Sequence, residues 1–245
     1  MTDTDYLDRE GVRLAYRHRR GRGPAILFLP GYMSDMAGNK ALALDAWAER
    51  EGRAMLRFDY AGRGESEGEF EAQTLATYLG DVLAMIDGVA AGPVLLVGSS
   101  MGGWLMLHAA LARPERVAAL VGIAAAPDFT DWGFSDAQKR ALEEQGRIEE
   151  PSEYGGYNIV TTRDFVRSGD SLKLLGAPIG IHCPVRLLHG LADMDVPWRN
   201  SLLLAERLRS SDVQTILVKG GDHRLSRDAD IALLIATVAQ LMEPM

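Results

Sequence analysis

A serine lies in the middle of a Gly-x-Ser-x-Gly pattern, formed by Gly98-Ser99-Ser100-Met101-Gly102. An apolar run precedes the pattern and a helix-forming stretch follows it. In such a strand-turn-helix setting, a serine hydroxyl is held exposed as a nucleophile. The two glycines suit the close approach of strand and helix around the turn, where a side chain would collide. We therefore predict that Ser100 is a catalytic nucleophile.

A serine hydroxyl needs a histidine to take its proton, and the histidine needs a carboxylate to orient it. Where the serine lies on this kind of turn, the three groups follow the chain order serine, acid, histidine. His223 lies late in the chain, in a polar loop after an apolar run at 214–218, so we assign it as the general base. We interpret the remaining histidines as structural or as misplaced for this role: His18, His108, His182 and His189.

The candidate acids lie in the segment 188–197, between a predicted strand and a predicted helix. Asp193 is nearer to the strand end, whereas Asp195 is close enough to the helix to serve its N-terminus. We prefer Asp193 as the catalytic acid. Asp222 is next to His223, but neighbouring side chains on an extended loop point apart, and we interpret it as a loop residue.

Acyl transfer also needs hydrogen-bond donors for the oxyanion, and backbone N–H groups commonly supply them. The residue after the nucleophile, Met101, provides one candidate. A second is Tyr32, which follows Pro30-Gly31 at the end of an early predicted strand. We predict that these two amides form the oxyanion hole.

A second glycine-containing loop, 59–66, follows another predicted strand. It lacks the lysine of a phosphate-binding loop, and the glutamates in and after it would repel phosphate. We interpret it as a structural turn beside the site.

Apolar runs rich in branched residues alternate with helical patterns, which is typical of a parallel sheet covered by helices. The predicted strands are 25–29, 54–58, 94–98, 117–123, 185–189 and 214–218, and the predicted helices are 41–51, 75–91, 102–112, 198–208 and 228–242. The segment 12–18 alternates apolar and polar residues and predicts an antiparallel strand at the sheet edge. We expect one domain over 1–245, with an insertion at about 128–178 that acts as a lid.

Composition narrows the class of protein. The net charge of −8 argues against nucleic-acid binding, which needs a surplus of basic residues. Cys183 is the only cysteine, which excludes an internal disulfide and a cysteine-rich zinc site. No apolar run is long enough to span a bilayer. The acidic N-terminus lacks the pattern of a signal or transit peptide, and from this we predict a cytoplasmic protein.

Three motifs together resemble the α/β-hydrolase superfamily. They are the D-x-x-G-x-G-x-S turn at 59–66, the serine turn at 98–102 and the G-x-x-D-x-x-V-P loop at 190–197. The resemblance implies an α/β-hydrolase fold, a mostly parallel twisted sheet flanked by helices. It also implies hydrolysis of esters or thioesters, with Ser100, Asp193 and His223 at the triad positions.

A narrower similarity is to mitochondrial α/β-hydrolases that act as palmitoyl-protein thioesterases and acyl-glucuronide esterases. Four stretches carry it: 29–36, 98–108, 186–190 and 221–224. Four residues of the insertion also match that pattern: Pro151, Ser152, Tyr154 and Tyr157. Because the chain shows no targeting extension, we expect a cytoplasmic relative of the bacterial type.

Together these features predict a serine hydrolase that forms an acyl-enzyme on Ser100. The expected substrate is a small-molecule ester or acyl thioester, or an acylated protein, and no metal or organic cofactor is expected. Hydrolysis of a carbon–carbon or amide bond on the same scaffold is an alternative. A non-catalytic ligand receptor is a further alternative, disfavoured because none of the three positions is missing.

Overall fold

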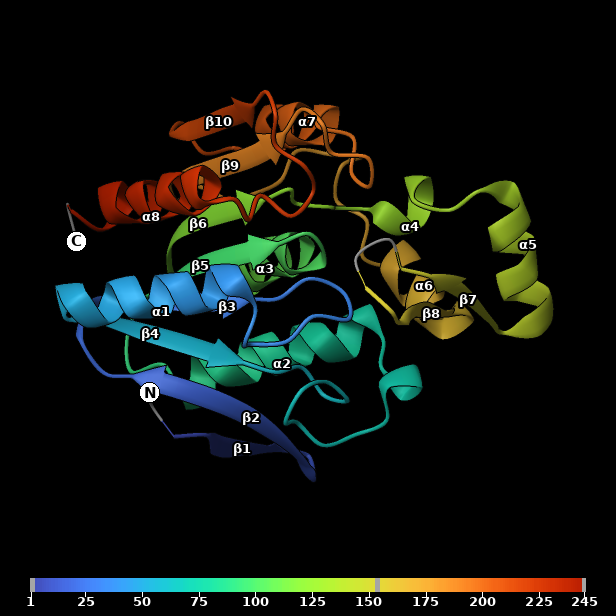
Figure 1. Cartoon of the computed structure of the whole chain (residues 1–245), viewed down its shortest axis with the longest axis horizontal. Coiled ribbons are helices and arrows are strands. Elements are labelled where there is room, and N and C mark those ends of the chain that lie inside the picture. The colour runs from blue at the N-terminus through green and yellow to red at the C-terminus, as the bar shows by residue number, and fades with distance from the viewer. Residues whose placement is uncertain (1–2, 153–154, 244–245) are drawn as a thin grey trace.

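The computed structural model describes residues 3–152 and 155–243. Its centre is an eight-stranded sheet with the spatial order β1-β2-β4-β3-β5-β6-β9-β10 (Figure 1). The strands are β1 (Asp5–Arg9), β2 (Val12–Arg19), β3 (Arg22–Leu29), β4 (Arg53–Phe58), β5 (Val94–Ser99), β6 (Val117–Ile123), β9 (Val185–Gly190) and β10 (Val213–Val218). In this spatial order, all neighbouring strands from β4 through β3 to β10 pair in parallel, whereas β2 pairs with β1 and β4 in antiparallel fashion. The predicted mostly parallel sheet is therefore confirmed.

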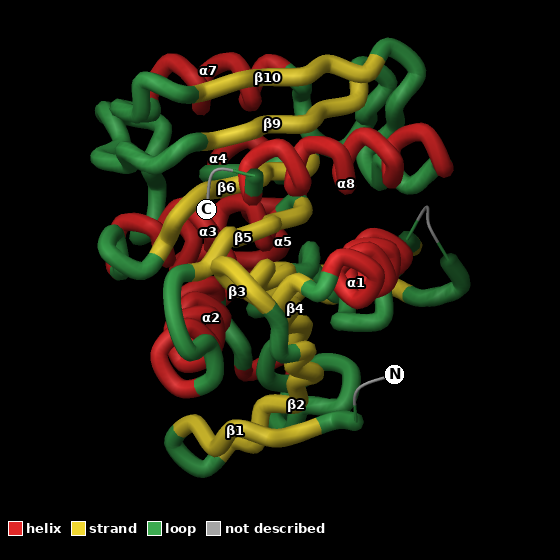
Figure 2. Tube along the Cα trace, turned by 90° about the vertical axis from the view of Figure 1, so that its left-hand side faces the viewer, coloured by secondary structure: helices red, strands yellow, loops and turns green. Residues whose placement is uncertain are grey.

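Helices cover both faces of this sheet (Figure 2). One face carries α1 (Asn39–Glu51) and α8 (Asp228–Met242), and the other carries α2 (Leu75–Gly88), α3 (Met101–Ala112) and α7 (Arg199–Arg207). Each face has its own cluster of buried apolar side chains. Leu44 and Val238 belong to the first cluster, and Trp104 and Leu204 belong to the second. No helix within 3–152 or 155–243 combines the length and apolarity that crossing a bilayer requires.

The strand β5 shows why the strands of this sheet are continuous apolar runs in the sequence. All of its residues are buried, because strands pair with it on both sides and helices cover both of its faces. The parallel arrangement brings the carboxyl ends of β3 to β6, β9 and β10 to one edge of the sheet. In Figure 1 the arrowheads point to this edge.

The sheet edge differs from the prediction. The strand β2 is antiparallel, as expected, but β1 pairs outside it and forms the edge. The turn between them contains Glu10 and Gly11, with φ values of 55° and 87°. The sequence analysis did not predict β1, because its sequence, Asp-Tyr-Leu-Asp-Arg, is mostly polar and an edge strand need not have an apolar face of its own.

Two predicted elements differ from the structure by three residues at one end. The helix predicted at 75–91 ends at Gly88, and the chain leaves it at Val89 before reaching Gly92 and Pro93, which disfavour helix. The strand predicted at 25–29 begins earlier, at Arg22. It does so by pairing with β4 of the same sheet.

Residues 128–178, called the inserted segment below, leave the β/α alternation but have regular structure of their own. The segment contains α4 (Phe129–Trp132), α5 (Asp136–Gln145), β7 (Arg147–Pro151), β8 (Asn158–Thr162) and α6 (Arg163–Asp170). The strands β7 and β8 form a separate antiparallel sheet. The segment lies beyond the carboxyl edge of the main sheet, on the right in Figure 1. Tyr154, part of the pattern noted above, lies outside the described residues.

Candidate active site

Ser100 lies on a strained turn between β5 and α3. Its φ of 53° and ψ of −117° are unfavourable for any residue with a side chain. A Cβ atom on Gly98 would lie 2.3 Å from the carbonyl oxygen of Gly102, and one on Gly102 would lie 2.1 Å from that of Leu29. The turn therefore requires both glycines, for the steric reason expected from the sequence.

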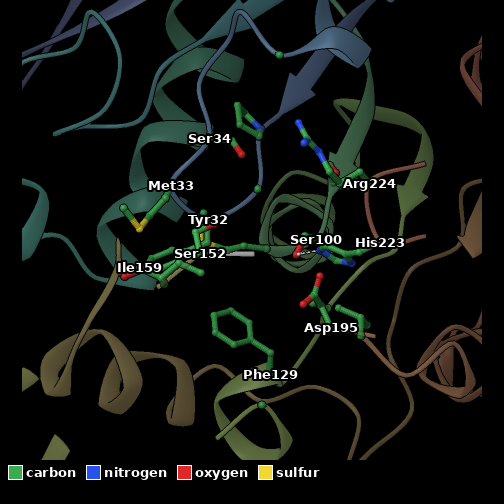
Figure 3. A pocket seen from close by; sticks show the side chains of 18 of the residues that line it. Tyr32, Met33, Ser34, Ser100, Phe129, Ser152, Ile159, Asp195, His223 and Arg224 are labelled. Carbon is green, nitrogen blue, oxygen red and sulfur yellow. Dashed lines mark hydrogen bonds between the residues drawn. The ribbon is translucent and has the colours of Figure 1, made fainter. Parts of the chain in front are cut away.

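The ring of His223, in the loop after β10, lies between Ser100 and Asp193. Its Nε2 is 3.2 Å from Ser100 Oγ, and its Nδ1 is 2.9 Å from Asp193 Oδ2. Figure 3 shows the ring beside the serine hydroxyl. Because Nδ1 faces a carboxylate, it carries the ring proton, which leaves the Nε2 lone pair facing the hydroxyl.

The Asp193 carboxylate is buried in the loop after β9 and accepts four hydrogen bonds. Its Oδ1 accepts the N–H groups of Asp195 and Val196 at 2.9 and 2.8 Å. Its Oδ2 accepts from the rings of His223 and His189. Burial raises the pKa of the Asp193 carboxyl, but the hydrogen bonds from His189 and His223 outweigh burial and hold the pKa below its usual range. Asp193 is therefore an ionised acceptor.

The two other aspartates considered in the sequence have different positions. Asp195 lines the cavity described below, and the helix α7 that it was thought to serve has Trp198 as its N-cap. Asp222 accepts the N–H of Leu225 at 2.9 Å, so it holds its own loop, as expected.

Two histidines predicted to be structural make internal hydrogen bonds. The Nε2 of His108 lies 2.8 Å from the carbonyl oxygen of Leu172, which joins α3 to the inserted segment. The buried His189 is the next-to-last residue of β9 and contacts Ser201 and Asp193. The contact between His189 and the candidate acid was not foreseen from the sequence.

The loop after β3 lies against the serine turn. A Cβ atom on Gly31 would be 3.4 Å from the Cβ of Ser100, and the next residue, Tyr32, lines the cavity together with Met101. The Tyr32 hydroxyl donates to the carbonyl oxygen of Val160, on β8, at 2.7 Å. The two residues predicted for the oxyanion hole are thus both at the serine, and one of them is tied to the inserted segment.

The glycine-containing loop after β4 has the structural role expected. The buried carboxylate of Asp59 accepts the N–H of Met36 at 2.7 Å and that of Glu65 at 2.8 Å. Burial raises the pKa of Asp59. The loop therefore joins the ends of β3 and β4 through one side chain.

A cavity of about 580 Å³ opens at Ser100. Figure 3 shows apolar side chains, among them Met33 and Ile159, on the opposite side of Ser100 from His223. Phe129, at the start of α4, forms another part of this wall. The sequence named no substrate-binding residues, because the residues of the inserted segment carry no spacing that predicts which of them face the serine.

Lys40, at the start of α1, also lines the cavity and was not predicted. Its ammonium group donates to the carbonyl oxygen of Arg224 at 2.5 Å, directly after His223. Burial lowers the pKa of Lys40 to about 8, with the charge of Arg224 as the next cause. Lys40 therefore helps to hold the loop that carries the candidate base.

Asp193, Asp195 and His223 place oxygen and nitrogen atoms within 4.8 Å of one another, a spacing at which they could bind a metal ion. Two of these residues already hydrogen-bond each other, so an ion would have to replace that bond. As it stands, the arrangement suits proton transfer from a serine hydroxyl to an imidazole held by a carboxylate.

Comparison with known proteins agrees with the fold. A model of the alpha/beta hydrolase family matches residues 26–243. The chain belongs to the α/β-hydrolase family. As a member of this family it is an enzyme, a hydrolase, and the predicted fold class is confirmed.

Individual α/β-hydrolases resemble nearly the whole chain. The human protein named palmitoyl-protein thioesterase ABHD10, mitochondrial, is 45% identical over 99% of this chain and 81% of its own length. The structure of alpha/beta hydrolase domain-containing protein 10 from mouse has a TM-score of 0.92 and 44% identity, covering 99% of both chains. A putative hydrolase from Agrobacterium vitis S4 also has a TM-score of 0.92, with 36% identity and 99% coverage of both chains. The narrower resemblance proposed from the sequence is confirmed.

These α/β-hydrolase relatives correct one prediction. The expected cytoplasmic location is wrong, because the human, bovine and mouse relatives are all named as mitochondrial proteins. The prediction used the acidic N-terminal residues, which lack the pattern of a signal or transit peptide. The absence of such a pattern does not determine a compartment.

Proposed function

We propose that this α/β-hydrolase cleaves carboxylic ester or thioester bonds through an acyl-enzyme on Ser100. The observation that carries the proposal is the continuous contact from Asp193 through His223 to the Ser100 hydroxyl, at 2.9 and 3.2 Å. In this assignment Ser100 is the nucleophile, His223 the general base and acid, and Asp193 the residue that orients His223 and stabilises its protonated form.

The reaction has two halves. In the first, His223 Nε2 takes the hydroxyl proton while Ser100 Oγ attacks the acyl carbon, and the same proton then passes to the departing alcohol or thiol. In the second, His223 takes a proton from water, the hydroxide attacks the acyl carbon, and the proton returns to Ser100 Oγ. The products are the acid and the free enzyme.

The backbone N–H groups of Met101 and Tyr32 are the proposed donors to the oxyanion. Support comes from the position of both residues on the cavity wall at Ser100. Each such donor contributes on the order of 3 kcal/mol to transition-state stabilisation. Because both donors are backbone groups, the assignment depends on the path of the two loops rather than on side-chain type.

The proposed substrates are small-molecule esters and acyl thioesters, including acylated proteins. Relatives named palmitoyl-protein thioesterase support an acyl thioester, and the apolar wall around Met33, Phe129 and Ile159 supports an acyl chain. A thiolate leaves with less help from a proton than an alkoxide does, so the same three residues can serve both bonds.

We also propose that 1–245 forms one domain and that the inserted segment acts as a lid. Two observations support the role as a lid. The segment lies beyond the carboxyl edge of the sheet (Figure 1), and it contributes Phe129 and Ile159 to the cavity wall. Such a segment excludes water from a reacting acyl group.

Covalent labelling by a fluorophosphonate tests the assignment of the nucleophile. The wild-type protein is expected to be labelled at Ser100, and Ser100→Ala is expected to lose both the label and the hydrolysis of p-nitrophenyl acetate. Ser99→Ala is the matched control, because it removes the neighbouring hydroxyl and leaves the turn intact. Retained labelling and hydrolysis in Ser100→Ala would disprove the proposal.

Rates with p-nitrophenyl esters and acyl thioesters of matched chain length then test the substrate class. Measurable hydrolysis of both bond types is expected, with a preference for longer chains. Failure to cleave any ester or thioester by a protein that is labelled at Ser100 would contradict the proposed substrates.

A further inference from the structure

A second histidine contacts the proposed catalytic acid and is not among the residues that line the substrate cavity. His189 is the next-to-last residue of β9 and is fully buried. Its Nε2 lies 3.1 Å from Asp193 Oδ2, the same oxygen that contacts His223. The two imidazoles therefore share one carboxylate oxygen.

The surroundings of His189 determine which of its nitrogens carries the proton. Its Nε2 is within hydrogen-bond distance of two acceptors, Asp193 Oδ2 and the carbonyl oxygen of Val196 at 3.0 Å, and neither group can donate. Its Nδ1 lies 2.7 Å from the hydroxyl of Ser201, which can donate. The ring thus donates from Nε2 and, when neutral, accepts at Nδ1.

This bond has two consequences for Asp193. It completes the set of four donors, two on each carboxylate oxygen, and so restricts rotation of the carboxylate. It also takes up part of the negative charge on Oδ2, the oxygen that faces His223. A carboxylate with fewer donors attracts a neighbouring imidazolium more strongly.

We infer that His189 is a positioning residue for catalysis, which orients the Asp193 carboxylate and moderates its attraction for protonated His223. The inference rests on the proposed function. His189 touches neither Ser100 nor the cavity, and it acts through Asp193 alone.

Other charged groups surround His223 and remain the same when His189 is replaced. Asp195 and Arg224 are on the cavity wall, Lys40 contacts the backbone of Arg224, and Asp222 precedes the ring in its own loop. A change that appears only on replacement of His189 therefore comes from the contacts of His189 itself, with Asp193, Val196 and Ser201.

Two substitutions distinguish the effect of losing the hydrogen bond to Asp193 from the effect of losing the rest of the His189 side chain. The amide nitrogen of His189→Gln can occupy the place of Nε2 and donate to Asp193. The shorter side chain of His189→Asn can reach only the place of Nδ1 and its contact with Ser201. Both variants lose the imidazole, so the loss of packing is shared between them.

The experiment measures kcat/KM for p-nitrophenyl acetate against pH in the wild type and both variants, with Tm measured for each. In His189→Asn, we expect the acid limb of the profile to move to higher pH by about half a unit and kcat to fall by about tenfold. His189→Gln is expected to restore most of kcat and to return the acid limb towards that of the wild type. Identical profiles in the two variants, whether normal or impaired, would overturn the inference.

A measurement on the wild-type protein covers the case in which neither variant folds. In protein labelled with ¹⁵N-histidine, His189 is expected to show a slowly exchanging proton on Nε2, with its signals identified by their change in Ser201→Ala. A proton on Nδ1 instead would overturn the inference. Hydrolysis by Ser100→Ala would disprove the proposed function, whereas this spectrum reports on His189 whatever the nucleophile is.

Discussion

At the scale of single residues, Ser100 is the proposed nucleophile and also has an unfavourable backbone conformation. Its φ of 53° is positive, and its hydroxyl lies 3.2 Å from His223 Nε2. Non-glycine residues in such sparsely populated regions cost about 1 to 3 kcal/mol. The cost persists in the folded protein because the packing of Gly98 and Gly102 against their neighbours leaves the turn no other path.

This strain predicts that Ser100→Gly is more stable than Ser100→Ala by about 1 kcal/mol. Both variants lack the hydroxyl, but glycine alone tolerates the positive φ. Urea unfolding measures the difference. The pair Ser99→Gly and Ser99→Ala is the control, and there glycine is expected to be the less stable, because residue 99 belongs to β5. Equal stability of the two residue-100 variants would show that the turn is not strained.

At the scale of elements, a buried carboxylate connects α2 to β1 and to the loop after β4. Asp81 accepts the N–H of Ala61 at 3.0 Å and lies 2.7 Å from Arg9 Nε. The ion pair is close but not aligned as a hydrogen bond. Burial raises the pKa of Asp81 to about 6, although Ala61 and Arg9 lower it.

This raised pKa predicts a dependence of stability on pH. Between the unfolded value of 3.8 and about 6, the folded protein holds a proton that the unfolded chain has released. The contribution of Asp81 to the free energy of unfolding is therefore fully present below this range and is lost as the pH rises through it, by about 3 kcal/mol. Urea unfolding of the wild type and Asp81→Asn across the range should show this loss in the wild type alone.

The exposed carboxylate of Asp164 provides the control for this experiment. Asp164→Asn is expected to keep the pH dependence of the wild type. If Asp81→Asn also keeps it, the proton is bound elsewhere.

At the scale of the whole molecule, the cavity exists because two parts of the chain meet over Ser100. The loops at the carboxyl edge of the sheet supply Tyr32 and His223, and the inserted segment supplies Phe129 and Ile159. The hydroxyl of Tyr32 joins the two parts through the carbonyl oxygen of Val160.

We therefore expect Ile159→Trp to shorten the preferred acyl chain. The larger ring fills the apolar side of the cavity, opposite His223 in Figure 3, and is expected to lower the ratio of kcat/KM for long over short p-nitrophenyl esters by about tenfold. Ile148→Trp is the matched control, because Ile148 lies on the neighbouring strand β7. An unchanged ratio in Ile159→Trp would place the acyl chain elsewhere.

The positions of the elements and of the serine turn could be read from the sequence. The apolar runs and the glycines around Ser100 could be recognised because burial of a strand and the close packing of a turn depend on residues that are neighbours in the chain. The edge strand β1 escaped this reasoning, because its polar residues pair by backbone hydrogen bonds that leave no pattern of side chains. The inserted segment was recognised by its composition, but its helices and separate sheet were not.

The sequence by itself determined the residue types that could react and their order along the chain, because parallel strands bring the loops at their carboxyl ends to one edge. Only the tertiary structure decided which aspartate meets His223, that His189 shares that aspartate, and that Lys40 and Ile159 reach the cavity. The physical reason is that the direction of a side chain depends on contacts between segments far apart in sequence. Ser100 and His223, for example, come within 3.2 Å although 123 positions separate them.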